Sequence, residues 1–288
     1  MRWPAFTTRD DVAMCAAASE DGRRTDELRS TFRQLHEHGL FVMPNPWDIG
    51  SAKLLAHLGF QALATTSSGH AASLGKYDQQ VTRDEMVEHV TVMTKAVDVP
   101  FNVDSERLFA DTPDGVAATV DLLAGAGAAG CSIEDYDPTT RSIDSIDVAT
   151  ERVRAAAEAA HRHGITLTAR AENALYRAND LADTIRRLCA YRDAGADVLY
   201  APGLSNIDDI ARVTREVDAP INVLALPKGP PTAALAEAGV RRVSTGGALA
   251  WAAYGALVRG ARELIDSGTS SYALDGLAAA DRKAFERS

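Results

Sequence analysis

Acidic side chains recur where the short apolar runs of this sequence end. Asp104 and Glu106 follow one such run, Glu134 ends another, and Asp78 and Glu172 lie in segments that follow two more. Carboxylates that gather in one place repel each other, so the group either raises a pKa or holds a cation. Oxygen donors without clustered His or Cys select a hard divalent ion, Mg2+ or else Mn2+. These residues therefore predict a metal site, with helix capping or pairing to neighbouring arginines as the alternative.

A cation and a run of hydroxyls accompany these acids. The guanidinium of Arg170 can bind a carboxylate or a phosphate through two parallel hydrogen bonds. The run Thr66–Gly69 can present O–H and backbone N–H groups to an oxyanion. Together they predict a small anionic substrate. The alternatives are that Arg170 is only a structural partner of Glu134 or Glu172 and that Thr66–Gly69 is an ordinary polar turn.

One unit recurs along the chain and must position these residues. It consists of an amphipathic stretch, a stop at glycine or at Val-Asp-x-Pro, and a short β-branched run with almost no polar alternation. Such runs are typical of a parallel sheet covered by helices. The predicted strands are Leu40–Pro44, Ala62–Ser67, Phe101–Asp104, Cys131–Asp135, Ile165–Arg170, Val198–Ala201, Ile221–Ala225 and Val243–Gly246.

Eight such units in 288 residues favour a closed (β/α)8 TIM barrel over an open doubly wound sheet. Side chains at the carboxyl ends of barrel strands converge on one mouth, so the acids described above should meet there. We expect one barrel domain over residues 26–288 that ends in a helical tail, with the long last helix over Gly247–Ile265. Residues 1–25 form a predicted extension ahead of a helix over Asp26–Glu37.

Composition limits the classes of partner. The net charge of −10 argues against nucleic acid and anionic membrane surfaces, because no local basic stripe compensates for it. No run reaches the roughly 20 apolar residues of a membrane span, and no signal peptide is recognisable. Three widely spaced cysteines fit neither a disulfide framework nor a zinc site. We therefore expect a cytoplasmic protein.

A glycine motif and several further residues have weaker functional interpretations. Residues 125–130 read GAGAAG, but the run ends a predicted helix and precedes a strand, which is the reverse of a dinucleotide site. His70 has a pKa suited to proton transfer, with packing as its alternative. Tyr136, Asp137 and Arg141 lie on a predicted lid after the fourth strand, where they could close over substrate, with ordinary solvated loop residues as the alternative. Ser244–Gly247 lies where barrels often bind phosphate.

Four segments in this order carry a family resemblance. LATTSSG followed by SLGKYD, then NVDSE, SIEDYD and TARAENAL, resemble the isocitrate lyase/phosphoenolpyruvate mutase superfamily over residues 28–265. ADVLYAPGL and NVLALP resemble its phosphonomutase-like branch, also labelled carboxyvinyl-carboxyphosphonate phosphorylmutase-like. The resemblance implies a Mg2+-dependent barrel that acts on a 2-oxo or 2-hydroxy acid through a pyruvate-like enolate.

The resemblance also implies a role for each site residue. Asp104 resembles the residue that contacts the metal, and Arg170, Asp104 and Glu134 are the expected catalytic residues. The residues that would hold metal-bound waters are Glu106, Glu134 and Asp78, and those that would bind substrate are Thr66, Ser67, Ser68, Arg170 and Glu172. The resemblance further implies a homo-oligomer, a dimer or a tetramer, in which the last helix is exchanged between subunits.

Departures from the family pattern narrow the reaction. Lyases of this superfamily carry a KRCGH-type loop after the fourth strand, and the mutases carry a Lys-Thr-Asn element there. Here Asp135–Ile143 contains no Cys, Lys or His, and Glu106 stands where an Asp is usual. We therefore favour cleavage of a carbon–carbon bond in a small dicarboxylate, by decarboxylation or retro-aldol chemistry. The alternatives are carbon–phosphorus chemistry of the phosphoenolpyruvate mutase or phosphonopyruvate hydrolase type, and a non-catalytic binding barrel.

Overall fold

Eight parallel strands form a nearly closed barrel in the computed structural model, which describes residues 9–176 and 180–286, with side chains from residue 22 onward. Neighbouring strands follow the order β1, β10, β9, β8, β7, β4, β3, β2. The hydrogen bond from the Ala64 N–H to the Pro44 carbonyl, 3.1 Å, links the two ends of this order. The strands are β1 Phe41–Met43, β2 Leu63–Ala64, β3 Phe101–Val103, β4 Gly130–Glu134, β7 Thr166–Arg170, β8 Val198–Tyr200, β9 Ile221–Leu224 and β10 Arg242–Ser244.

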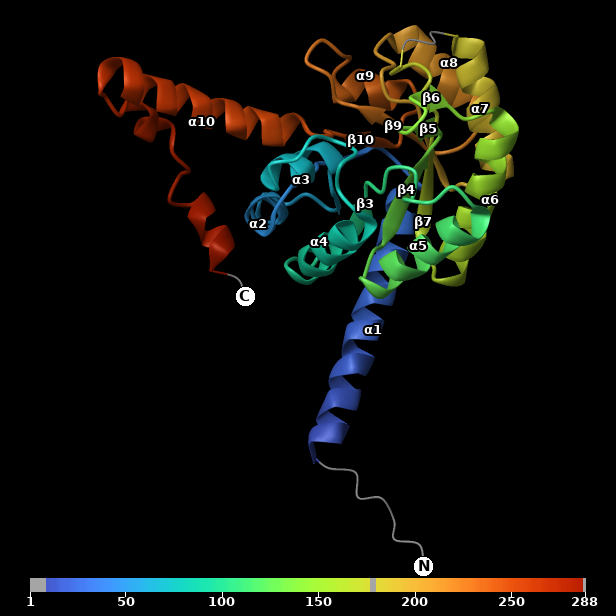
Figure 1. Ribbon diagram of the computed structural model, residues 1–288, viewed down its shortest axis with the longest axis horizontal. Helices are drawn as coiled ribbons and strands as arrows, with labels where there is room; N and C mark the ends of the chain where they lie inside the picture. The colour runs from blue at the N-terminus through green and yellow to red at the C-terminus, as the bar shows by residue number, and fades with distance from the viewer. Residues whose placement is uncertain (1–8, 177–179, 287–288) are drawn as a thin grey trace, which may run out of the picture.

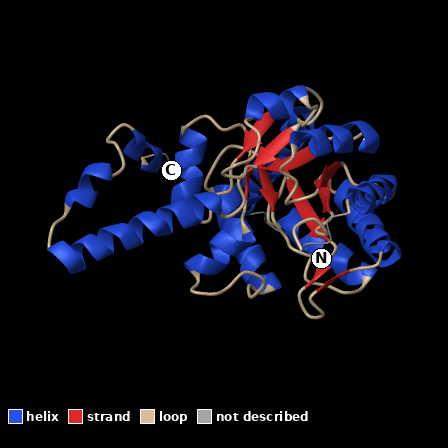
Figure 2. Cartoon of the chain, turned by 90° about the horizontal axis from the view of Figure 1, so that it is seen from above, coloured by secondary structure: helices blue, strands red, loops and turns tan. Residues whose placement is uncertain are grey.

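Helices alternate with the strands and surround them (Figure 1; Figure 2). Side-chain caps fix several helix starts, as where Thr82 and Glu85 form a reciprocal capping box. The helices are α1 Arg9–Leu35, α2 Ile49–His57, α3 Ser67–Ser73, α4 Arg83–Lys95, α5 Pro113–Gly125, α6 Ile146–Arg162, α7 Leu181–Asp193, α8 Ile207–Val217, α9 Thr232–Glu237 and α10 Ala248–Ser267, with 3-10 helices η1 Ser271–Asp275 and η2 Asp281–Phe285.

The barrel prediction is confirmed, and all eight predicted strands are present with their ends shifted by a few residues. The largest shift is at the second strand, which was predicted to reach Ser67. Ser67 is instead the first residue of α3, because the Thr66 side chain accepts a hydrogen bond from the Gly69 N–H and caps that helix. The GAGAAG run lies between α5 and β4, as expected for a helix stop.

The first helix is longer than its predicted segment. α1 spans Arg9–Leu35, so the helix expected over Asp26–Glu37 is the carboxyl-terminal part of a longer one. Alanine and charged residues with high helix propensity extend it toward the N-terminus. Its end packs beneath the barrel, where Phe32 is fully buried, and its start projects away from the barrel (Figure 1). Residues 1–8 of the predicted extension lie outside the described residues.

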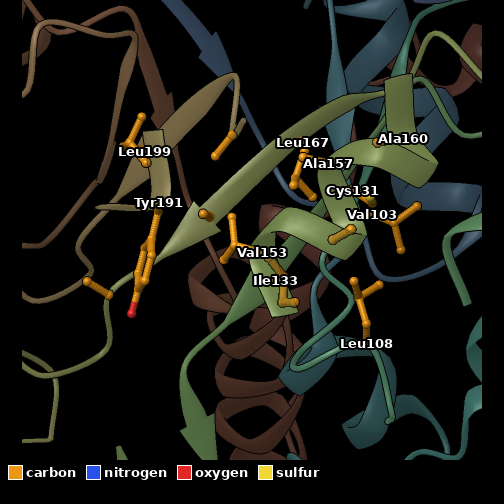
Figure 3. Packing of buried hydrophobic residues seen from close by; sticks show 14 of the residues in the cluster. Val103, Leu108, Cys131, Ile133, Val153, Ala157, Ala160, Leu167, Tyr191 and Leu199 are labelled. Carbon is orange, nitrogen blue, oxygen red and sulfur yellow. The ribbon is translucent and has the colours of Figure 1, made fainter. Parts of the chain in front are cut away.

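The apolar core lies between the strands and the helices rather than inside the barrel. Cys131 and Ile133 of β4 and Leu167 of β7 point outward against Val153 and Ala157 of α6 (Figure 3). All five side chains are buried. Full burial of a valine, leucine or isoleucine side chain stabilises a fold by about 1.5–3 kcal/mol. The core therefore holds the strand ends at fixed positions around the mouth.

The interior of the barrel is polar. Asn102, Ser132, Thr168, Asn222 and Arg242 point into it from β3, β4, β7, β9 and β10, and all five are buried. These residues alternate along their strands with the outward apolar side chains, as the two-residue period of a strand requires. The polar interior continues directly from the mouth of the barrel.

The carboxyl-terminal helix extends away from the barrel (Figure 1; Figure 2). η1 packs against α10 and η2 against α2, so the tail runs back toward the body. Trp251, Leu257, Ile265 and Leu274 of this region are between 55% and 88% exposed. Within the described residues, no helix is long and apolar enough to span a membrane.

Candidate active site

The mouth of the barrel contains a cavity of about 250 Å³ at the carboxyl ends of the strands. Several predicted site residues line it, namely Thr66, Ser67, Ser68, Asp78, Asp104 and Arg170. A larger cavity of about 520 Å³ lies at the amino ends of the strands, lined by Thr166, Asp197 and Arg241 among others. None of the predicted site residues lines that larger cavity. The candidate active site is therefore the smaller cavity.

Arg170, the last residue of β7, is the electrostatic centre of the mouth. Its Nη1 donates to Asp104 Oδ1 at 2.7 Å, its Nε donates to Glu172 Oε1 at 2.7 Å, and its Nη2 lies 3.3 Å from Glu134 Oε2. The ring of Tyr200 lies under the guanidinium, with 5.2 Å between Cζ and the ring centroid. Arg170 is thus both a structural partner of Glu134 and Glu172 and a cation beside the cavity.

Asp104 connects Arg170 to the hydroxyl run. Its Oδ2 accepts a hydrogen bond from the Ser67 backbone N–H at 2.9 Å, while its own N–H donates to Thr65 Oγ1 at 2.9 Å. Its side chain is 18% exposed toward the cavity. One carboxylate therefore fixes the relative positions of β3, β7 and the start of α3.

The other predicted acids lie around this pair in different settings. Glu134 is 4% exposed and accepts a hydrogen bond from Gln79 Nε2 at 3.1 Å. Asp78 is exposed at the rim. Glu106 lies in a left-handed backbone conformation with φ of 48°, so the chain leaves strand geometry after Asp104, and it faces a small separate cavity that Asp104 also lines. Asp78 and Asp104 therefore line the cavity at the mouth, whereas Glu106 faces the separate cavity and Glu134 is buried beside Arg170.

Electrostatics at the mouth favour an additional cation. Burial and the negative charges of Asp104 and Asp78 raise the pKa of Glu106 to about 8. Burial also raises the pKa of Glu134, against the attraction of Arg170 and with help from the neighbouring Glu172. Three carboxylates, those of Asp104, Glu134 and Glu172, share the charge of Arg170, so a positive ion would relieve their mutual repulsion.

The donor set fits a hard divalent cation. All candidate donors are carboxylate oxygens, which Mg2+ and Mn2+ prefer. Within the described residues, no three His, Cys, Asp or Glu side chains converge as ligands of one ion. Of the predicted ligands, Asp78 and Asp104 line the cavity, and an ion held there by one or two carboxylates would keep several waters, as Mg2+ usually does. Asp104, which lines the cavity, would make the direct contact.

The predicted lid is a short β-hairpin that the sequence did not reveal. β5 (Tyr136–Asp137) pairs antiparallel with β6 (Ser142–Ile143). Ion pairs anchor both ends, from Asp137 Oδ1 to Arg107 Nη1 at 2.9 Å and from Asp144 Oδ2 to the buried Arg152 Nη1 at 2.9 Å. The hairpin is therefore held to the body of the barrel by buried charges.

Further residues of the mouth were missed by the sequence analysis. Tyr176 stacks on Tyr136, with 3.8 Å between the ring centroids. Partial burial raises the pKa of Tyr176, and the negative charge of Glu134 adds to this effect. Asn45, which follows β1, links this strand to its two neighbours in the barrel. Its Oδ1 accepts a hydrogen bond from Thr245 N, after β10, at 2.9 Å, and its Nδ2 donates to the Thr65 carbonyl, after β2, at 2.7 Å. Asn45 directly follows the first predicted strand, so a complete search of strand ends would have found it.

His70 lies beside the mouth and has a packing contact. Its ring stacks on that of His89 with 3.7 Å between centroids. Both ring nitrogens of His70 are buried without a hydrogen-bond partner in the described part of the chain. Burial lowers the pKa of His70, which favours the neutral ring. This geometry agrees with the packing alternative for His70.

The raised pKa of Glu106 predicts a pH-dependent stability of the metal-free protein. The folded chain keeps the Glu106 proton up to about pH 8, whereas the unfolded chain loses it near 4.5. Glu106 therefore contributes stability below pH 4.5, and this contribution is lost as the pH rises to about 8. Urea unfolding in EDTA between pH 5 and 8.5 should show a steeper loss for wild type than for Glu106→Gln. If the unfolding free energies of wild type and variant depended equally on pH, Glu106 would not have a raised pKa in the folded protein.

Comparisons with known proteins give one consistent result. The family model described as phosphoenolpyruvate phosphomutase matches residues 32–265. A solved candidate lyase/mutase from Burkholderia cenocepacia J2315 is 46% identical, covers 92% of this chain and 98% of its own, and has a TM-score of 0.88. An oxaloacetate decarboxylase of Paraburkholderia xenovorans is 30% identical over 275 residues, 90% of this chain and 91% of that protein. A solved oxaloacetate acetylhydrolase in complex with oxalate is 26% identical, with 89% and 92% coverage and a TM-score of 0.80.

Proposed function

Because the chain belongs to the phosphoenolpyruvate phosphomutase family, we propose that it is a divalent-metal-dependent lyase that cleaves a carbon–carbon bond of a small 2-oxo or 2-hydroxy dicarboxylate. The observation that carries the proposal is the cluster at the mouth, where Arg170 lies within 3.3 Å of Asp104, Glu134 and Glu172 beside an open cavity. The relative named oxaloacetate decarboxylase supports a dicarboxylate substrate.

The residues of the mouth have separable tasks in this reaction. The O–H groups of Ser67 and Ser68 line the cavity and can bind the substrate carboxylate. Arg170 provides positive charge next to the place where an enolate oxygen gains negative charge. Glu134 and Glu172 hold the guanidinium in position, because both are nearly fully buried against it. Because the guanidinium is already in position, it can stabilise the negative charge of the enolate without reorganisation during the reaction.

A Mg2+ or Mn2+ ion bound at Asp104, with Glu106, Glu134 and Asp78 toward its water shell, would polarise the 2-oxo group and accept charge from it. The lid favours decarboxylation over retro-aldol cleavage. Within the described residues the β5–β6 hairpin presents no Cys, Lys or His toward the mouth. Decarboxylation does not require an acid during bond breaking, since the enolate can take its proton from water afterwards.

The proposal is tested by pyruvate release from a panel of substrates with Mg2+ or with EDTA. The panel contains oxaloacetate, substituted 2-hydroxy dicarboxylates, 2-methylisocitrate and phosphonopyruvate. We expect metal-dependent pyruvate from one dicarboxylate, lost in EDTA and restored by added Mg2+. Turnover of phosphonopyruvate alone would select carbon–phosphorus chemistry. Ligand binding without any turnover would select the non-catalytic barrel.

We also propose that the protein forms a homo-oligomer, a dimer or a tetramer, through α10. Leu257 and Ile265 of α10 are 66% and 82% exposed, and apolar faces of this kind are usually covered by a partner. The projection of α10 from the barrel would let it pack on a second copy (Figure 1).

Replacing Leu257 by aspartate should weaken this assembly. We expect light scattering to shift from a multiple of the 30.6 kDa chain mass toward the single chain. Val148→Asp is the matched control, because Val148 is 47% exposed near the start of α6, which packs on α5 and α7 on the far side of the barrel from α10 (Figure 1). A wild-type protein that runs as a single chain at micromolar concentration would overturn the assignment.

A further inference from the structure

Arg242 is a second arginine of the same cavity, and the interpretation of the sequence gave it no role. It is the first residue of β10, it is 2% exposed, and it points into the barrel interior. Its Nε donates to Asn222 Oδ1 at 2.9 Å and its Nη2 donates to Thr168 Oγ1 at 2.9 Å. Its Nη1 lies 3.3 Å from His36 Nε2, whose other nitrogen is bonded to the Phe32 carbonyl. Each of these three partners, Asn222, Thr168 and His36, is neutral.

The charge of Arg242 has no counterion in the described part of the chain. Asp or Glu side chains pair with the other buried arginines there, such as Arg107 with Asp137 and Arg152 with Asp144. No described carboxylate lies within ion-pair distance of Arg242, and burial lowers its pKa to about 9. The side chain still carries its charge near neutral pH. An unpaired buried charge is costly, so a fold that keeps one has a use for it or for the anion that neutralises it.

The position of Arg242 suits an anion inside the catalytic cavity. Arg242 lines the same cavity as Ser67, Asp104 and Arg170. Its hydrogen-bond partner Thr168 precedes Arg170 by two residues on β7, and both point into the cavity. Two residues advance a strand by roughly 7 Å. The Arg242 guanidinium therefore lies about one layer below the mouth, a separation comparable to the length of a four- or five-carbon dicarboxylate.

The two arginines also differ in available charge. Arg170 is shared among three carboxylates, whereas the partners of Arg242 among the described residues are neutral. A guanidinium has five N–H donors, and three of those of Arg242 have partners. The remaining donors can bind a carboxylate at the floor of the cavity.

We propose that Arg242 binds the far carboxylate of the substrate and thereby makes the cavity selective for dicarboxylates over monocarboxylates. The inference rests on the proposed function, since it assigns the second carboxylate of the proposed substrate. The carboxylate and 2-oxo or 2-hydroxy group at the near end stay at the mouth with Ser67 and Asp104. The far carboxylate points down into the barrel and takes the place of the missing counterion.

The test compares two probes that differ only in that carboxylate, malate and 2-hydroxybutyrate, by calorimetric binding in the presence of Mg2+. Wild type should bind malate at least about tenfold more tightly. Arg242→Gln should weaken malate binding by about 10- to 100-fold and leave 2-hydroxybutyrate nearly unchanged. Arg241→Gln is the matched control, because the neighbouring arginine lines the cavity at the opposite end of the barrel. Thermal unfolding confirms that each variant is folded.

The outcomes separate this inference from the proposed function. Equal affinity of wild type for the two probes would overturn the inference even if Arg242→Gln failed to fold. Equal loss of both probes in a folded Arg242→Gln variant would also overturn it, since that result indicates a structural role. Selective loss of malate without turnover of any substrate would support the inference and count against the lyase. In an active enzyme, the substitution should raise KM for the dicarboxylate far more than it lowers kcat.

Discussion

Replacing Asp104 by asparagine should lower kcat/KM about a thousandfold, equivalent to about 4 kcal/mol of transition-state stabilisation. Asp104 lines the cavity, holds Nη1 of Arg170 at 2.7 Å and accepts the Ser67 N–H at 2.9 Å. The asparagine amide keeps the size of the side chain but removes the negative charge that would bind the metal. The variant would therefore bind the metal more weakly and hold Arg170 less firmly in position.

Asp111→Asn is the matched control for this experiment. Asp111 follows the same strand and pairs with Arg107 at 3.5 Å, but its side chain is 90% exposed. We expect its kcat/KM to stay within about twofold of wild type, because exposed ion pairs contribute little. Steady-state kinetics over a range of Mg2+ concentrations measures both variants. An Asp104→Asn enzyme within tenfold of wild type would exclude Asp104 as the central metal-binding residue.

Replacing Arg152 by alanine should destabilise the fold by about 3–5 kcal/mol, because it leaves buried acceptors and a buried carboxylate without their partner. Arg152 is 2% exposed. Its guanidinium binds Asp144 Oδ2 at 2.9 Å and the carbonyls of Arg107 at 2.6 Å and Ala110 at 3.1 Å. These bonds join α6, the loop after β3 and the base of the lid hairpin.

The matched control is Arg154→Ala, two residues further along α6 on the exposed surface. We expect it to change stability by less than about 0.5 kcal/mol. Urea unfolding followed by circular dichroism gives both values. A loss below 1 kcal/mol for Arg152→Ala would show that water replaces its bonds and that the lid is anchored elsewhere.

Local sequence patterns determined most of the fold. Each strand of the barrel is a short β-branched run after a glycine or Val-Asp-x-Pro stop, and the eight runs predicted the eight strands. Because a parallel barrel brings the carboxyl ends of its strands together, the same reading predicted that Asp104, Glu134 and Arg170 would meet. The prediction failed at Thr66. Its side chain caps α3, so the second strand ends earlier than the pattern indicated.

The roles of the two arginines at the start of β10 required the tertiary structure. Arg241 directly precedes β10 and lines the cavity at the amino ends of the strands, whereas Arg242, the first residue of β10, points into the barrel. Sequence alone does not show that Arg242 and Ser244 line a cavity, although these two polar residues alternate with the apolar Val243. Nor does it show that the partners of Arg242 are Thr168, 74 residues away, and His36, 206 residues away.

The amino-acid sequence by itself therefore determined the barrel, its order of strands along the chain, the acids at its mouth and the family. These follow from short-range periodicity and from residue types at strand ends. The tertiary structure decided the stacking of Tyr136 on Tyr176, the anchoring of the lid by Arg152, and the position of Arg242 inside the cavity without a counterion among the described residues. The physical reason is that charge pairing and stacking depend on distances between residues far apart in the chain, which only the closed barrel sets.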